Sequence, residues 1–435
     1  MEFAFGIVVF VVGLLASIAL HEVGHMVPAK KFGVRVSQYM VGFGPTIWSK
    51  TKGETEYGFK WIPLGGYVRL IGMYPPSRAV GNPPARTWLG RLAADARDAS
   101  AEEIREGEDH RAFYRLSTPK KLVVMLGGPV MNLVIALVLM ATVMVGFGIP
   151  AASTTLDTVS ACVIPASAPV DRGCEPGDQP APGAAAGLLP GDKVLSFDGT
   201  RIDEWSALTP LIRAAGGEST PIVVERDGQE LTLTVTPVVA DRPVLDENGE
   251  AKLDAAGDPV TEPVGFLGVT SRWLRDRAPI GDVPRMVADQ TWQTMGVVAT
   301  LPARVGDIAS TTFGGGERGT DSVVGPVGIG RFAGEIASSD LDLGDKAVSI
   351  LLLLASLNIA LFVFNLIPLP PLDGGHVAAA LWEGGRRQVA RLRGRPRPGP
   401  FDSAKLVPVA YTVFILLGGV GLMLLYADIV NPVTI

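Results

Sequence analysis

The chain has 435 residues, of which 47% are hydrophobic and 19% are charged, and its formal net charge is −6. This composition, with a mean hydropathy of +0.31, is typical of a membrane protein that also carries soluble parts, and the length excludes one small domain. No basic stretch interleaved with aromatic residues indicates a nucleic-acid surface, so nucleic acid is not an expected partner.

Four uncharged apolar stretches are long enough to cross a bilayer, which takes roughly 18 to 20 residues. They are 3–20, 122–149, 347–372 and 406–426. The first stretch lacks a basic region before it and a small-residue cleavage site after it, so we expect a retained helix and not a removed signal peptide. The sequence thus predicts a polytopic α-helical membrane protein with four transmembrane helices in a lipid bilayer.

The distribution of basic residues predicts the orientation of these helices. Segment 30–121 holds 16 basic and 9 acidic residues, and segment 384–405 holds 7 and 1, so both should be cytoplasmic. Segment 150–344 holds 14 basic and 28 acidic residues, which fits the outside of the membrane. Four spans then leave both termini outside.

The first apolar stretch runs directly into His21-Glu22-Val23-Gly24-His25. Residues four apart share one face of a helix, so His21 and His25 can offer two imidazole nitrogens to one metal ion. Glu22 flanks that face, where its carboxylate can take a proton from the attacking water. Ionisable groups inside hydrocarbon cost several kcal/mol unless they are paired, ligated or hydrated, and they are candidates for function by default. The alternative is a polar cluster at the membrane boundary without a metal.

Segment 32–73 is predicted to form a small membrane-associated β-sheet on the cytoplasmic side. Its β-prone runs, separated by glycine-containing turns, are 34–40, 46–49, 57–62 and 67–70. A free edge of this sheet could accept an extended substrate as an added strand, or the sheet could simply cap the helices. Segment 74–121 is predicted as a cytoplasmic loop. Its first part, 74–108, turns to Pro, Ala, Arg and Glu and should be solvated and partly disordered, up to a short helical patch at 110–116.

Both cysteines, Cys162 and Cys174, fall in the segment assigned to the outside. An oxidising exterior permits a disulfide between them, and two unrelated free thiols are an equally weighted alternative. Metal ligation by these cysteines is not expected, because no histidine lies near them in the sequence.

Within 150–272 a small domain is predicted, with a strand near 193–199, a helix at 204–215 and a hairpin around Asp227-Gly228. Segment 181–237 resembles a PDZ domain of the permuted bacterial kind, with 241–262 as a polar insertion and 265–269 expected to close the sheet. Such domains bind chain ends or extended peptides by strand addition, although a mere spacer is the alternative.

The external region 273–344 shows helical periodicity over 283–310, which we expect to lie along the outer membrane face. A flexible break is expected at 314–320.

A catalytic zinc site needs three protein ligands and an open position, so a third ligand must come from another helix. The end of the third span reads Asn365-Leu366-Ile367-Pro368-Leu369-Pro370-Pro371-Leu372-Asp373-Gly374-Gly375-His376. Its prolines break the helix, so that the Asp373 carboxylate can turn inward. His376 is the other candidate ligand on these grounds.

These motifs together resemble the site-2 protease family of intramembrane metalloproteases, over essentially the whole chain. A further family motif is matched by Gly127-Gly128-Pro129-Val130-Met131-Asn132, and Gly325-Pro326-Val327-Gly328-Ile329 resembles a segment of the bacterial members. The resemblance implies Zn²⁺ on His21, His25 and Asp373, with Glu22 as the general base. It also implies that Asn132 and Asn365 hydrogen-bond the substrate or the developing oxyanion, and a role as interhelical contacts is the alternative for both.

The likeness is closest to bacterial regulators of sigma-factor signalling that carry one PDZ domain. It implies a multi-pass protein of the bacterial plasma membrane, with its active site towards the cytoplasm. Its expected substrate is a single-pass membrane protein already trimmed by another protease, either an anti-sigma factor or a remnant signal peptide. Two rivals remain: a catalytically silent scaffold that binds peptide ends, and a metal transporter. The sequence predicts no oligomeric state.

The predicted domain boundaries follow from these assignments. They are 1–31 (first helix), 32–73 (sheet), 74–121 (loop), 122–149 (second helix), 150–272 (external domain), 273–344 (external linker), 345–375 (third helix), 376–405 (cytoplasmic loop), 406–427 (fourth helix) and 428–435 (tail).

Overall fold

The computed structural model describes residues 1–81, 87–164, 172–244, 252, 260–314 and 322–431. The chain forms two compact units. The first comprises Met1–Phe147 and Ala278–Ile435, and the second is Gly148–Arg277.

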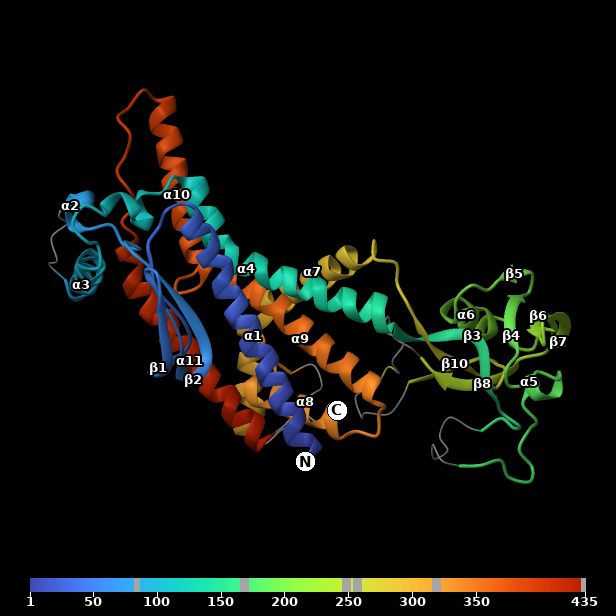
Figure 1. Cartoon of the computed structure of the whole chain (residues 1–435). Helices are drawn as coiled ribbons and strands as arrows, with labels where there is room; N and C mark the ends of the chain where they lie inside the picture. Colours follow the sequence, from blue (N-terminus) through green and yellow to red (C-terminus); the bar gives the residue numbers. More distant parts are fainter. Residues whose placement is uncertain (82–86, 165–171, 245–251, 253–259, 315–321, 432–435) are drawn as a thin grey trace. The chain divides into compact units, whose positions relative to one another are not determined.

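Four helices of the first unit are long and apolar enough to cross a membrane, among the residues that the structure describes. They are α1 (Glu2–Lys31), α4 (Thr118–Ala141, continued by a π-helical turn over Thr142–Phe147), α9 (Leu343–Asn365) and α11 (Val407–Val430). Helices α1, α4 and α9 lie side by side (Figure 1). The expected four apolar helices are therefore confirmed.

Small residues let α1 approach its neighbours closely, as is usual between membrane helices. A Cβ on Gly24 would lie 2.2 Å from the carbonyl oxygen of Gly127, so the backbones of α1 and α4 touch there. A buried hydrogen bond of 3.0 Å from Asn358 Nδ2 to Ser17 Oγ joins α9 to α1. The helices are thus held at fixed positions around the segment that carries the histidines.

The small sheet consists of two long, bulged antiparallel strands, β1 (Val36–Lys52) and β2 (Thr55–Leu70). Each long strand bends and contributes two runs to the sheet. Met40 in β1 pairs with Tyr67 on one side and with Gly58 on the other, and Gly58 pairs in turn with Ser49. The runs therefore lie in the order 66–70, 36–41, 55–60 and 46–52, and they correspond to the four strands expected from the sequence. Run 66–70 is an edge among the described strands.

The prediction of a loop over 74–121, solvated in its first part, is wrong. The segment contains α2 (Ser77–Val80), α3 (Trp88–Glu102) and two short 3₁₀ turns, η1 (Asp109–Arg111) and η2 (Phe113–Arg115). Helix α3 buries Arg97, whose guanidinium is bonded to both carboxylate oxygens of Asp402 at 3.0 and 2.8 Å. Helix α3 also buries Ala93 and Ser100, so the polar composition from which a solvated loop was predicted belongs to a packed helix.

The region around the third span also differs from the prediction. Helix α9 ends at Asn365, and after a proline-rich break a new helix, α10 (Asp373–Leu392), begins at Asp373 itself. The predicted cytoplasmic loop 376–405 is thus largely helical, and it ends in a 3₁₀ turn, η4 (Ser403–Leu406), before α11. Proline at 368, 370 and 371 accounts for the break, because proline cannot continue a helix.

Between the second unit and α9 the chain forms α7 (Val283–Gly314) and α8 (Pro326–Ser338). Helix α7 packs against α4, α9 and α11, and the expectation that 283–310 lies along the outer membrane face stays a prediction. Helix α8 packs against α1, and its first turn is capped by Asp428 of α11, which accepts from the Gly328 N–H at 2.8 Å. The break expected at 314–320 lies almost entirely outside the described residues.

The second unit is built mainly of strands, with α6 packed on them. Its elements are β3 (Ile149–Val159), α5 (Pro182–Ala185), β4 (Lys193–Phe197), β5 (Thr200–Arg201), α6 (Trp205–Ala214), β6 (Thr220–Arg226), β7 (Gln229–Val235), β8 (Val238–Pro243), β9 (Thr261–Phe266) and β10 (Val269–Asp276). The main sheet has the order β10-β3-β4-β6-β7, and β8 pairs with β9 separately. Its core includes Phe197, Leu208 and Ile222, all fully buried.

This unit contains the expected strand, helix and Asp227-Gly228 hairpin as β4, α6 and the β6–β7 pair. Segment 265–269 does not form one closing strand, because Gly268 adopts a φ of 79° and separates β9 from β10. The ends of the expected insertion 241–262 pair with each other, Arg242 opposite Glu262. A disulfide joins Cys162 to Cys174, with 5.9 Å between their Cα atoms.

Candidate metal centre

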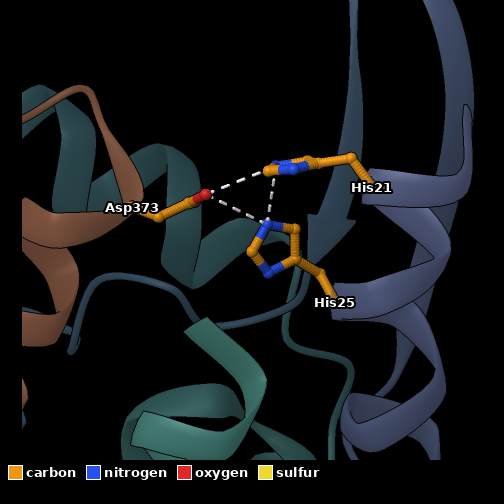
Figure 2. Close-up of side chains that lie close together, drawn as sticks. All are labelled: His21, His25 and Asp373. Atoms are coloured by element: carbon orange, nitrogen blue, oxygen red, sulfur yellow. Dashed lines mark hydrogen bonds and ion pairs between the residues drawn. The ribbon is translucent and has the colours of Figure 1, made fainter. Parts of the chain in front are cut away.

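Three side chains from two helices converge on one point (Figure 2). His21 and His25 lie one turn apart on α1, and Asp373 occupies the first turn of α10. Asp373 Oδ2 lies 3.3 Å from the Nε2 atom of each histidine, and the two Nε2 atoms are 3.2 Å apart. All three possible ligand atoms lie within 4.8 Å of one another.

Hydrogen bonding fixes which nitrogen of His25 faces this point. Its Nδ1 lies 2.8 Å from the carbonyl oxygen of Val124 on α4, and since a carbonyl only accepts, Nδ1 carries the proton. In the neutral ring, Nε2 therefore presents its lone pair towards the Asp373 carboxylate. A backbone carbonyl on the far nitrogen is the usual orienting partner of a metal-binding histidine.

The surroundings of the cluster fit a bound zinc ion. Two imidazole nitrogens and one carboxylate oxygen are a donor set that zinc takes at catalytic sites. The buried Asp373 Oδ2 has no hydrogen-bond partner among the described residues. A Cβ on Gly128 of α4 would lie 2.2 Å from His25 Nε2 and 2.6 Å from His21 Nε2, so the missing side chain leaves room there.

The cluster opens into a cavity of about 340 Å³. Glu22, which is 9% exposed, lines this cavity, and so do Asn365 and His376. Gly66, Tyr67 and Val68 from the edge run 66–70 line the same cavity. A Cβ on Gly66 would lie 3.1 Å from Glu22 Cγ, so glycine permits the strand to approach the carboxylate. The candidate base Glu22 and the free edge of run 66–70 thus line the same cavity.

Comparison with known proteins decides the family. The sequence model of Peptidase family M50 matches residues 9–396. The chain belongs to this peptidase family. Zinc metalloprotease Rip1 of Mycobacterium tuberculosis is 34% identical over 448 residues, covering 100% of this chain and 99% of the relative. Rip1 of Mycolicibacterium smegmatis is 32% identical with complete coverage of both chains.

A more distant relative agrees with this assignment. Zinc metalloprotease RasP of Geobacillus kaustophilus is 26% identical over 420 residues, covering 85% of this chain and 87% of the relative. The chain is therefore a zinc metalloprotease, with zinc as its metal and helices apolar enough for a membrane protein.

The two asparagines singled out in this M50 peptidase lie in different places. Asn365 lines the cavity, at the end of α9. Asn132 on α4 is fully buried, does not line the cavity, and both its amide atoms lack a partner among the described residues. The helix-to-helix hydrogen bond is made instead by Asn358, which the sequence analysis missed.

A buried ion pair holds the helix that carries Asp373. Lys121 of α4 bonds both carboxylate oxygens of Glu383 at 2.9 Å, and the two side chains are 7% and 3% exposed. Arg387, one turn further along α10, bonds Glu383 at 2.7 Å. Sequence reasoning placed these residues in separate loops, and only the fold brings them together.

Proposed function

We propose that this M50 peptidase is an intramembrane endopeptidase in which His21, His25 and Asp373 hold the zinc ion. The observation that carries the proposal is the convergence of these three side chains beside Glu22 in one cavity. The cluster lies near the end of α1 marked by Lys30 and Lys31. By the distribution of basic residues that end is cytoplasmic, with both termini outside.

Zinc, when bound, supplies a Lewis acid that polarises water and the scissile carbonyl. The Glu22 carboxylate takes the proton from the attacking water and later gives it to the leaving amine. For Asn365, which lines the cavity, the proposed role is to donate from its side-chain amide to the substrate carbonyl as negative charge develops on that oxygen. Asn132 lies outside the cavity and its amide atoms bond no described residue, so we assign it no role in the reaction.

The strand edge at 66–70 explains how a membrane-spanning substrate could be presented. A helical substrate hides its carbonyl groups in internal hydrogen bonds, so it must unwind before it can be cut. An unwound segment can pair with the free edge of run 66–70 and lie beside Glu22 in the cavity. This mode selects substrates by their ability to unwind.

For the second unit we propose a PDZ-type role outside the membrane. A cavity of about 310 Å³ lies between α6 and residues 265–269, where a peptide end could bind. The guanidinium of Arg242 lies over the ring of Phe266 at 3.7 Å, and its Nε and Nη2 atoms have no partner among the described residues. The substrate that we propose is a single-pass protein trimmed beforehand, such as an anti-sigma factor, with remnant signal peptides as a second class.

The test is cleavage of a pre-trimmed single-pass substrate by the purified full chain in detergent. Glu22→Gln and zinc chelation should each abolish a specific cut, while Glu230→Gln, an exposed change of the same kind in β7, should leave it intact. Zinc content is measured for each protein. A zinc-loaded wild type that cuts none of several unrelated substrates would favour the silent scaffold instead.

A further inference from the structure

The second half of α10 carries a basic stretch that the proposed peptidase chemistry does not use. Residues 386–397 include six arginines and no acidic residue. Arg387 is bonded to the buried Glu383. In contrast, Arg391, Arg395 and Arg397 make no ion pair with any described residue. Three uncompensated guanidinium groups on one segment repel each other and favour an anionic partner.

Four of the arginines line one cavity of about 600 Å³ between α10 and the start of α4. They are Arg387, Arg391, Arg395 and Arg397. The other wall includes Ser117 and Thr118, which offer hydroxyl groups, and none of the described lining residues is acidic. The planar fork of arginine matches the oxygens of a phosphate group, often with two parallel hydrogen bonds. The shape and charge of the cavity thus fit a phosphate ester.

A second cavity, of about 860 Å³, adjoins the first and is largely apolar. It is lined by apolar side chains such as Leu381, Trp382 and Val389 and also by Arg386 and Arg393, while Arg395 lines both cavities. Trp382 is 63% exposed and Leu381 55% exposed, although the rest of α10 buries its small residues. An exposed apolar face beside a basic face is the pattern of a helix that lies at a membrane surface.

We propose that the basic cavity binds the phosphate of an anionic phospholipid, whose acyl chain lies along Leu381, Trp382 and Val389. A soluble phosphate ester would use only the arginines, whereas a lipid accounts for both cavities and for the exposed tryptophan. Basic pockets beside membrane helices are sites where acidic headgroups bind. Since α10 begins at Asp373, a bound lipid would also anchor the helix that carries this member of the metal cluster.

The experiment is a lipid titration of the full-length chain in an uncharged detergent, with bound lipid counted by native mass spectrometry. Phosphatidylglycerol should bind more tightly than neutral phosphatidylcholine. The double variant Arg391→Gln, Arg397→Gln should bind phosphatidylglycerol about 30-fold more weakly, because each arginine beside an anionic headgroup contributes a factor of about five. Both side chains are exposed and lie outside the metal cluster.

The matched control is Arg386→Gln, Arg393→Gln, which makes the same charge change on the same segment but lines only the apolar cavity. Its affinity for phosphatidylglycerol should fall much less. Equal losses in the two variants would show attraction by net charge alone and would overturn the proposal. So would glycerophosphoglycerol, the soluble headgroup, binding as tightly as the intact lipid. Glu22→Gln should bind lipid like the wild type, so this test stands apart from the peptidase assay.

Discussion

Replacing Gly128 by alanine should abolish zinc binding while the chain still folds. The added Cβ would lie 2.2 Å from His25 Nε2, whereas ordinary Cβ contacts begin at 3.4 Å. His25 cannot retreat, because its Nδ1 is bonded to the Val124 carbonyl. Zinc–nitrogen distances are held within about 0.2 Å, so a displacement of roughly 1 Å removes at least one ligand.

The size of the effect follows from what metal sites tolerate. Changes to residues that merely orient a ligand cost about 10- to 100-fold in metal affinity, and loss of the ligand itself costs more. We therefore expect Gly128→Ala to weaken zinc binding by more than about 100-fold and to lose proteolysis with it. Alanine favours a helix by about 1 kcal/mol over glycine, so the helix itself is not weakened. Zinc per chain, measured after equilibration with graded chelator, gives the affinity.

Two other glycines supply the controls. Gly146→Ala lies in the π-helical turn that continues α4, where a Cβ would meet nothing within 4 Å, and it should bind zinc normally. A Cβ on Gly127 would lie 2.0 Å from the Gly24 carbonyl oxygen, so Gly127→Ala should lower the melting temperature by forcing α1 and α4 apart. A Gly128→Ala protein that retains zinc with wild-type affinity would refute the reasoning.

Three further predictions concern other contacts. Lys121→Met should lower the free energy of unfolding by less than the roughly 3–5 kcal/mol that a fully unpaired buried charge costs, because Arg387 still bonds the buried Glu383 carboxylate, and a melt in detergent measures this loss. Asn365→Ala should slow cleavage by about 10²–10³-fold with zinc content unchanged, if its amide donates to the developing oxyanion. In the second unit, burial opposes ionisation of Asp192, but the Arg226 guanidinium holds the pKa of Asp192 below its usual value. The stabilisation by this pair should be complete above pH about 4 and lost as the pH falls through the folded pKa, as acid unfolding of this region would show.

Each of these has its own check. The double variant Lys121→Met, Glu383→Leu removes the buried carboxylate but also the partner of Arg387, which is 17% exposed, so it should recover only part of the stability. Parallel loss of zinc and activity in Asn365→Ala would mean that the residue supports the metal site and does not contact substrate. Asp192→Asn should flatten the acid limb of the stability curve, and an unchanged limb would assign the pH dependence to other groups.

The metal cluster could be predicted largely from local spacing. A helix fixes His21 and His25 on one face, so two of the three side chains follow from the apolar run before them. Asp373 is different, because its approach depends on the proline break after α9 and on tight packing at Gly374, whose Cβ would lie 2.2 Å from the Ile367 carbonyl oxygen. Spacing alone did not decide whether Asp373 or His376 is the third metal ligand. Only the family motif favoured Asp373.

What the sequence did not reveal are helices that bury polar faces. Helix α3 buries Arg97 and Ser100, and α10 buries Glu383, so the charged and polar residues of both segments were interpreted as solvated. Their partners, Asp402 and Lys121, lie far away in the chain. From the sequence alone, a charged residue that is buried and paired cannot be distinguished from one exposed to solvent, because its partner is not known.

The Arg97–Asp402 pair limits how this peptidase can be recombined with its relatives. It ties a helix between the first two spans to the residues just before the last one, and both side chains are almost fully enclosed, at 4% and 9% exposure. A chimera that takes residues 88–102 from a relative, without the segment that contains position 402, would bury a charged side chain without its matching partner. Segments 88–102 and 398–406 therefore form one exchangeable module, even though about 300 residues of sequence separate them.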